Sequence, residues 1–205
     1  MRYEGIDISK HNRVQNFVRL SAAVDFVIIR AGGNYDGYYK DSRFEEYYKG
    51  AKTYGIPVGA YYDAGKEFIG EQKGRDYANH FLKLIAGKKF EYPIFLDIEV
   101  TPRKYRKEIT AAAVAFCDTL EDAGYFCGIY ASDVSGFKEL LIIEQVAKYS
   151  KWVARYGAQP SYTRKYGIWQ YTSKGTVPGI IGNVDRDVSF INYPEIIKGG
   201  HFNGY

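Results

Sequence analysis

The order of strand-like and helix-like segments is the feature that most constrains the fold of this chain. Five runs with strand character occupy the first two-thirds of the sequence, at residues 3–9, 26–32, 57–64, 93–100 and 126–132. Segments with helical character lie between these runs, and such alternation predicts a parallel sheet with right-handed crossovers. The run FVIIRAG is continuous and β-branched, which is typical of a strand buried on both faces.

The expected helices cover residues 16–23, 41–54, 67–86 and 103–123, with one or two short helices within 133–148. Asp41 or Ser42 is the expected N-cap of the second helix, and Gly87 and Gly124 end the third and fourth. The first two-thirds of the chain therefore predict five βα units.

The pattern changes near residue 150. Three more β-like runs, at 151–157, 166–173 and 183–191, have connections too short and too rich in Gly and Pro for full helices. Eight strands in 205 residues predict a single α/β domain over residues 1–205, built as a closed or nearly closed barrel. A doubly wound open sheet is the alternative, and the three terminal strands argue against it. The Gly-rich tail IKGGHFNGY is expected to be a frayed terminus.

Charge and hydropathy exclude two classes of partner. The net charge is +4, but the basic residues are scattered and form no block of five or six, so we expect no nucleic acid partner. The longest uncharged apolar runs have the length of a strand, so we expect no membrane span. The start, MRYEGIDISK, has no apolar core of signal-peptide length. We therefore expect a protein that is cytoplasmic as made, exported by a non-classical route, or cut from a longer chain.

The Cys and His residues give no metal site. Cys117 and Cys127 stand in apolar surroundings, which favours buried free thiols over a disulfide bridge. The three histidines lie far apart in the sequence, and no Cys/His cluster with ligand spacing occurs. We therefore expect no metal bound by soft ligands.

The stretch YPIFLDIEV places two acids, Asp97 and Glu99, in an otherwise core-like strand. Side chains two residues apart in a strand point the same way, roughly 6.5 Å apart along the chain. Two like charges on one buried face repel each other and cost desolvation energy. We expect this repulsion to help keep one of the two acids protonated near neutral pH.

Acids recur near the C-terminal ends of other predicted strands, where a barrel builds its site. They are Asp7 in GIDIS, Asp63 in AYYDA, Asp97 and Glu99 in FLDIEV, and Asp185 and Asp187 in NVDRD. One such acid would be an ordinary cap of the following segment. Acids on four strands predict a single acidic mouth, and 21 tyrosines, many of them at strand ends, predict an aromatic rim.

Two kinds of chemistry use clustered carboxylates without His or Cys. In glycoside hydrolysis, one acid protonates the leaving oxygen while another attacks or stabilises the anomeric carbon. In metal-dependent phosphoryl chemistry, the carboxylates bind Mg²⁺ or Mn²⁺. No Gly-rich phosphate loop of either common type occurs. The surplus of Tyr and Trp at strand ends therefore favours a sugar substrate.

Six segments, in order, resemble glycoside hydrolase family 25, the lysozymes (N-acetylmuramidases) of bacteria and their phages. They are GIDISKHN, DSRFEEYYKGAKTYGIPVGAYY, YPIFLDIE, GIYAS, WVARYG and GIWQYTSKGTVPGIIGNVDRD. The resemblance covers essentially the whole chain. It implies an irregular TIM-like barrel of five βα units followed by three strands, which agrees with the order of elements above.

The resemblance also implies roles for individual residues. Glu99 is similar to the general acid, and Asp97 to the partner that orients or stabilises the reacting N-acetyl group or oxocarbenium ion. Asp7 and Asp185 match the supporting acids, with Asp185 preferred to Asp187 because Gly182-Asn-Val-Asp185 fits the family pattern G-x-V-D. Three aromatic residues fall where substrate-lining side chains are expected: Tyr61, Tyr130 and Trp169.

Two stretches depart from the family pattern. Family members often carry Lys-Ala-Thr-Glu-Gly after the second strand, whereas this chain has Arg30-Ala-Gly-Gly-Asn34, with Gly33 in place of the Glu. The third strand usually reads GAYHF and here reads GAYYDA, so Tyr62 and Asp63 replace His and Phe. We expect Tyr62 and Asp63 at the rim, where they affect substrate preference, although Asp63 fits a loop-start N-cap equally well.

The resemblance implies an enzyme that hydrolyses the β-1,4 bond between N-acetylmuramic acid and N-acetylglucosamine of bacterial peptidoglycan. It implies neither a metal nor an organic cofactor. An inactive barrel that only binds cell-wall glycans is the alternative, followed by a metal-dependent phosphoesterase that EDTA would inhibit. We expect a monomer of the endolysin or autolysin type. An endolysin would stay in the host cytoplasm until it is released to the cell wall, whereas an autolysin would act outside the cell.

Overall fold

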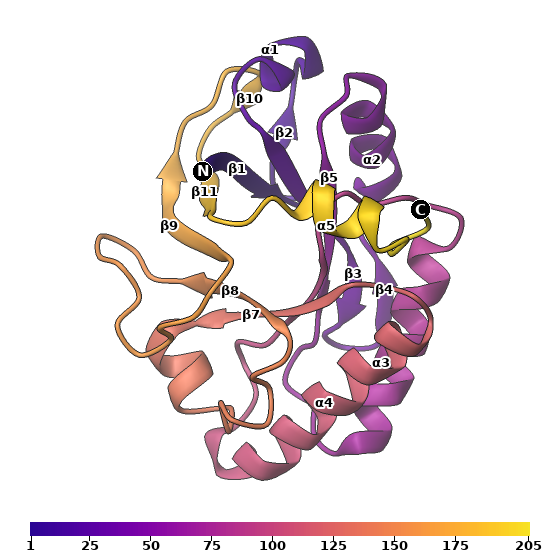
Figure 1. Ribbon diagram of the computed structural model, residues 1–205, viewed down its shortest axis with the longest axis vertical. Helices are drawn as coiled ribbons and strands as arrows, with labels where there is room; N and C mark the ends of the chain where they lie inside the picture. The colour runs from indigo at the N-terminus through magenta and orange to yellow at the C-terminus, as the bar shows by residue number, and fades with distance from the viewer.

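The centre of the structure is a barrel of eight strands, seen in a computed structural model that describes residues 1–205 (Figure 1). The strands are β1 (Tyr3–Ile8), β3 (Phe26–Asn34), β5 (Val58–Asp63), β6 (Ile94–Asp97), β7 (Cys127–Ser132), β8 (Ser150–Ala154), β9 (Ile168–Gly175) and β11 (Val184–Ser189). The barrel closes because β1 pairs with both β3 and β11. The predicted α/β barrel is therefore confirmed, and the open doubly wound sheet is not formed.

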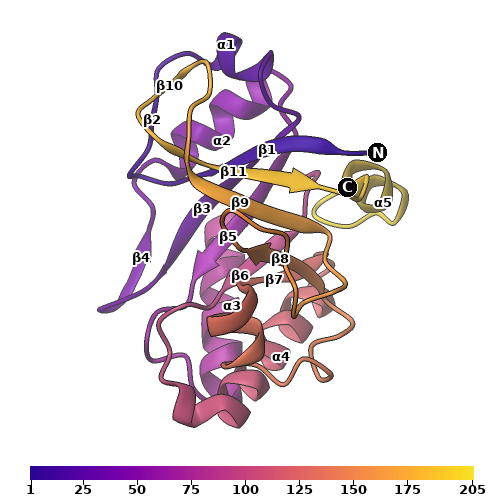
Figure 2. The same ribbon diagram turned by 90° about the vertical axis from the view of Figure 1, so that its left-hand side faces the viewer.

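Strand direction differs from the prediction at one position. Seven of the eight barrel strands run in the same direction, whereas β11 is antiparallel to both of its neighbours, β9 and β1 (Figure 2). Asp185 therefore lies at the start of its strand rather than near the C-terminal end. Because β11 is reversed, its start lies at the barrel end where the parallel strands finish, with Asp185 opposite Asp7 in register. The carboxylates still meet at one mouth.

Helices cover only part of the barrel. They are α1 (Phe17–Ser21), α2 (Phe44–Thr53), α3 (Glu71–Ile85), the 3₁₀ turn η1 (Arg103–Tyr105), α4 (Arg106–Asp122), the π-helical turn η2 (Asp133–Lys138) and α5 (Tyr193–Gly199). α3 and α4 lie side by side on the outside of the sheet (Figure 1). A Cβ at Gly74 would stand 2.1 Å from the carbonyl oxygen of Ala112, so only glycine permits this approach.

Two apolar cores hold these layers together. One lies between the helices and the outside of the sheet, and the other fills the barrel interior with side chains such as Phe26, Phe95 and Trp152. Neighbouring residues of a strand enter different cores, because side chains alternate between faces. Tyr61 accordingly belongs to the inner core and Tyr62 to the outer core.

The two cysteines are buried and unpaired, which confirms the sequence-based expectation. No helix in the structure has both the length and the apolar character needed to cross a bilayer.

Several local features differ from the prediction. The helix expected from Asp41 begins at Phe44, because Asp41 binds the backbone N–H groups of Lys10 and Arg43 and the guanidinium of Arg30. Three short strands have no counterpart in the prediction: β2 (Arg13–Val14), β4 (Tyr38–Lys40) and β10 (Ile180–Ile181). β4 extends the sheet beside β3, and β2 pairs with β10.

The C-terminal tail is ordered, so the expectation of a frayed terminus is wrong. α5 places Tyr193 and Ile197 in the inner core, at the barrel end opposite the carboxylates (Figure 2). Beyond α5, the fully buried Asn203 accepts a hydrogen bond from the Phe126 N–H (2.7 Å) and donates one to the Tyr92 carbonyl (3.0 Å). The tail thus closes this end of the barrel.

Replacing Asn203 by alanine is expected to lower the free energy of unfolding by about 2–4 kcal/mol, because two buried backbone groups lose their partners. For a chain of this size, that corresponds to a fall in Tm of roughly 5–12 °C in calorimetry. Asn192→Ala is the matched control, because the Asn192 amide binds only Glu195 at the surface, and its effect should stay within about 0.5 kcal/mol. Equal effects of the two changes would contradict a structural role for the tail.

Candidate active site

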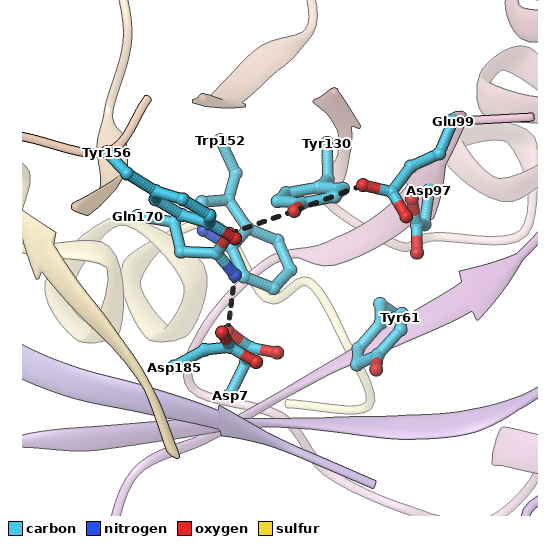
Figure 3. Close-up of a pocket in the computed structure, with 9 residues that line it drawn as sticks. All are labelled: Asp7, Tyr61, Asp97, Glu99, Tyr130, Trp152, Tyr156, Gln170 and Asp185. Atoms are coloured by element: carbon cyan, nitrogen blue, oxygen red, sulfur yellow. Dashed lines mark hydrogen bonds between the residues drawn. The ribbon is translucent and has the colours of Figure 1, made fainter. Parts of the chain in front are cut away.

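A pocket of about 190 Å³ opens at the barrel end where the parallel strands finish (Figure 3). Nine residues line it: Asp7, Tyr61, Asp97, Glu99, Tyr130, Trp152, Tyr156, Gln170 and Asp185. All four carboxyl side chains that the family resemblance singled out are among them. Four of the six acids that the sequence places near strand ends therefore line one pocket, whereas Asp63 and Asp187 do not, and the chemical roles of all of them stay predictions.

The four acids form two pairs on opposite sides of the pocket (Figure 3). Asp97 is the last residue of β6, and Glu99 follows in the loop. Asp7 and Asp185 are paired across β1 and β11. Tyr130 and Gln170 lie between the two sides, as Figure 3 shows.

Gln170 organises this polar site. Its Oε1 accepts hydrogen bonds from the hydroxyls of Tyr130 (2.9 Å) and Tyr156 (3.0 Å), so its Nε2 is left to donate to Asp7 Oδ2 (2.7 Å). The Tyr130 hydroxyl also lies 3.5 Å from Glu99 Oε1. A continuous chain of polar contacts therefore runs from Glu99 through Tyr130 and Gln170 to Asp7.

Burial raises the pKa of every acid in the pocket, and the charges of neighbouring carboxylates raise it further for Asp7, Asp97 and Glu99. Burial raises the pKa of Asp7 well above its usual value, with further contributions from the charges of Asp187 and Asp185. Burial likewise raises the pKa of Asp97, and the charge of Glu99 is the next cause. The pKa values of Glu99 and Asp185 are also raised, again chiefly by burial. The pocket therefore favours the protonated form of its carboxyl groups more than water does.

The expected relation between Asp97 and Glu99 is changed in two respects. The two acids do not share one strand, because β6 ends at Asp97 while Ile98 turns into the outer core and Glu99 is exposed at the mouth. The charge of Glu99 helps to raise the pKa of Asp97. For Glu99 itself, burial is the main cause of the raised pKa, and the charges of Asp63 and Asp185 also raise it. Asp97 Oδ1 is buried and has no hydrogen-bond partner in the protein.

Asp63 lies beside the pocket rather than in its lining. Its carboxylate accepts hydrogen bonds from the Tyr39 hydroxyl (3.0 Å) and the Gly65 N–H (3.3 Å), so it both caps the following turn and adds negative charge near the mouth. A Cβ at Gly33 would stand 2.4 Å from the Asp63 carbonyl oxygen and 2.8 Å from its Cβ. The two departures at 33 and 63 are therefore in direct contact.

Two of the predicted aromatic residues line the pocket, and two do not. Tyr61 and Tyr130 line it, and both pack against Trp152, with ring centroids 5.9 and 4.4 Å away. Tyr62 points to the outer core, where its hydroxyl bonds to His80 Nδ1, so its expected place at the rim is wrong. Trp169 also lies outside the pocket lining, with its indole N–H bonded to the Arg155 carbonyl.

Sequence reasoning missed Trp152, Tyr156 and Gln170. Strand alternation could have found Gln170, because it shares a face of β9 with the buried Ile168, whereas Trp169 points the other way. A glutamine on the buried face of a strand is itself a signal, since it needs polar partners inside. Tyr156 follows β8 in a loop, and its position has no comparable signal in the sequence.

No group of three or more His, Cys, Asp or Glu residues in the structure has an arrangement that could hold a metal ion.

The profile of the glycosyl hydrolases family 25 matches residues 6–180. The chain belongs to this family. The matched part contains Asp7, Asp97 and Glu99, and Asp185 lies just beyond it.

Individual proteins that are similar to the chain agree with this assignment. The chain is 27% identical over 186 residues to an autolytic lysozyme of Clostridium acetobutylicum, covering 90% of this chain and 55% of that protein. It therefore spans about half the length of this curated relative. Among solved structures, it resembles the catalytic domain of endolysin ply40 from bacteriophage P40 of Listeria monocytogenes (29% identity, TM-score 0.75, 97% and 98% of the two chains).

Two longer solved proteins are also similar. The CTP1L endolysin shares 29% identity with a TM-score of 0.79, over 96% of this chain and 70% of that one. The modular autolysin LytC from Streptococcus pneumoniae, solved with a synthetic peptidoglycan ligand, shares 26% identity with a TM-score of 0.79, over 92% and 47% of the two chains.

Proposed function

We propose that this chain is a peptidoglycan hydrolase that cleaves the β-1,4 bond between N-acetylmuramic acid and N-acetylglucosamine. The observation that carries the proposal is the convergence of Asp7, Asp97, Glu99 and Asp185 on one pocket with aromatic walls. Membership of family 25 and the likeness to autolysins and endolysins support it. We further propose that the protein acts on the cell wall as a monomer.

Glu99 is the proposed proton donor. It is exposed at the mouth, where a glycosidic oxygen can reach it, and its raised pKa favours the protonated form that a proton donor needs. The Glu99 proton passes to the leaving oxygen as the bond from that oxygen to the anomeric carbon breaks. The ionised Glu99 that remains is stabilised by the nearby Tyr130 hydroxyl, and it can then accept a proton from the attacking water.

Asp97 is the proposed stabiliser of the reacting sugar. Its unpartnered Oδ1 is an acceptor available to the substrate's N-acetyl group, and its negative charge favours the positive charge that develops at the anomeric carbon. Asp7 and Asp185, on the opposite side, offer further acceptors for sugar hydroxyls or amide groups. Tyr61, at the pocket wall, supplies an aromatic face on which a sugar ring can stack.

A suspension of purified Gram-positive cell walls tests the proposal directly. Catalytic amounts of the protein should clear the turbidity progressively with time. A barrel that only binds glycans would sediment with the walls and leave the turbidity unchanged, and that result would contradict the proposal.

Replacing Tyr130 by phenylalanine is expected to shift the pH profile of activity. The Tyr130 hydroxyl lowers the pKa of Glu99 by stabilising its ionised form, so its loss should raise that pKa further. The alkaline limb of kcat/KM, set by the deprotonation of the donor, should then move to higher pH, while kcat falls by about tenfold. An alkaline limb that moves to lower pH would show that Glu99 is not the donor.

A further inference from the structure

A fifth carboxyl group, that of Asp187, lies inside the barrel and takes no part in the mechanism above. It is fully buried in β11, and it is not among the residues that line the pocket. Asp187 Oδ1 accepts a hydrogen bond of 2.7 Å from the indole Nε1 of Trp152. Its position is therefore fixed by a side chain that does line the pocket.

The second oxygen of Asp187 raises a question of hydrogen bonding. Oδ2 is buried and no N–H or O–H group of the protein donates to it. Its neighbour within hydrogen-bonding reach is the carboxyl group of Asp7, which is itself 6% exposed. Two carboxylates can form a hydrogen bond only when one of them carries a proton, and two buried ionised carboxylates in contact repel strongly. One proton between the two carboxyl groups therefore gives Asp187 Oδ2 a hydrogen-bond partner and removes one of the two negative charges.

We propose that Asp187 and Asp7 share one proton in the folded protein, in a hydrogen bond between Asp187 Oδ2 and the Asp7 carboxyl group, so that Asp187 acts as a positioning residue for the pocket floor. Asp7 is then bound from two directions, by Gln170 Nε2 and through the shared proton by Asp187 Oδ2. With both contacts made, the Asp7 carboxylate is held at one orientation toward the pocket. Because the proton lies on the Oδ2 side, Asp187 Oδ1 stays free to accept the hydrogen bond from the Trp152 indole. This hydrogen bond connects the Asp7–Asp187 pair to the aromatic wall of the pocket.

The charged groups around this pair favour the shared proton. Asp185 and Arg186 lie on the same strand as Asp187; the charge of Asp185 raises the pKa of Asp187, and that of Arg186 lowers it. The Arg186 side chain turns toward Glu4 at the surface. From the other side, the pair faces the charge of Asp97.

Three tyrosines, Tyr61, Tyr130 and Tyr156, also face Asp7, and burial raises the pKa of each, so they stay neutral. No cation contacts the pair directly to offset a second negative charge. Burial raises the pKa of Asp187 to about 8, in agreement with this arrangement.

The first test is a stability measurement that needs no enzymatic activity. In Asp187→Asn, the amide has the shape of a protonated carboxyl group. Its oxygen can accept a hydrogen bond from Trp152, and its N–H can donate one to Asp7. An unfolded Asp187 ionises near pH 4. The folded one keeps its proton to about pH 8, so between these values unfolding releases a proton and wild-type stability falls as pH rises.

The Tm of the wild type minus that of Asp187→Asn should therefore fall by at least about 5 °C from pH 4 to pH 8. A difference that stays constant or rises overturns the proposal, and so does an Asp187→Asn variant that does not fold.

Asp133→Asn is the matched control. Burial alone would raise the pKa of Asp133. Hydrogen bonds from the backbone N–H groups of Thr163 and Ser161 and from the Arg155 guanidinium instead hold this pKa at about 2. Above pH 5 the Asp133 carboxyl group is ionised in both the folded and the unfolded protein. The Tm of the wild type minus that of Asp133→Asn should therefore stay constant from pH 5 to pH 8.

The second test rests on the proposed function and compares two substitutions of Asp187 in wall hydrolysis at neutral pH. Asp187→Asn should keep at least about a third of the wild-type kcat/KM, whereas Asp187→Leu, which offers no donor to Asp7, should lose at least about tenfold. Equal losses in both variants would show that the ionised form is needed, and would overturn the proposal. If the wild type hydrolyses no wall, the proposed function fails, and the stability test still decides the protonation of Asp187.

Discussion

Replacing Glu99 by glutamine is expected to lower the rate of cell-wall hydrolysis by about a thousandfold or more. The amide has nearly the same shape but no acidic proton, so the leaving sugar oxygen departs without protonation. Glu99 is exposed at the mouth and its side chain has one hydrogen-bond contact, a long one to Tyr130, so the fold should tolerate the change. The rate is measured by turbidity loss, and Tm should stay within about 2 °C of the wild type.

Glu108→Gln is the control for this variant. Glu108 is an exposed glutamate in the first turn of α4 and makes no side-chain hydrogen bond. Its rate should equal that of the wild type. Near-wild-type lysis by Glu99→Gln would remove Glu99 from the role of general acid.

Replacing Asp97 by asparagine is expected to lower kcat by about a hundredfold to a thousandfold, with a much smaller change in KM. The carboxylate is proposed to act on charge that develops only in the transition state, and such a contribution appears in kcat. The pH profile should change as well. In the proposed mechanism Asp97 acts in its ionised form, so its protonation produces the acid limb of the wild-type profile, whereas asparagine does not titrate.

The acid limb should therefore flatten in Asp97→Asn while the alkaline limb remains. Asp122→Asn, an exposed carboxylate at the end of α4, is the control and should leave both limbs in place. An Asp97→Asn enzyme with unchanged kcat and a raised KM would show that Asp97 only binds substrate.

Local patterns were enough to predict most of the barrel. The β-branched run in β3 and the alternation of strands with helices require no knowledge of distant contacts. The reversed direction of β11 could not be read in this way, because it depends on which strands lie next to it after closure. The ordered tail was missed for a similar reason, since the polar Asn203 is buried only through contacts with Phe126 and Tyr92, 77 and 111 residues away.

The candidate site shows the same division. The four acids were predicted because their chemistry is costly to bury and they stand at strand ends. The aromatic residues were predicted by type rather than by the face of the strand on which they lie, and this error placed Tyr62 and Trp169 in the site instead of Trp152 and Gln170. Asp187 was set aside for Asp185 on a family pattern, although both side chains lie near Asp7.

The measurement that tests the central claim most directly is mass spectrometry of the muropeptides released from purified walls, after chemical reduction of their new reducing ends. Cleavage between N-acetylmuramic acid and N-acetylglucosamine leaves muramic acid at those ends, so the account predicts reduced muramic acid in the wild-type digest and none above background with Glu99→Gln. Reduced N-acetylglucosamine at the new ends, or release of the same products by Glu99→Gln, would contradict it.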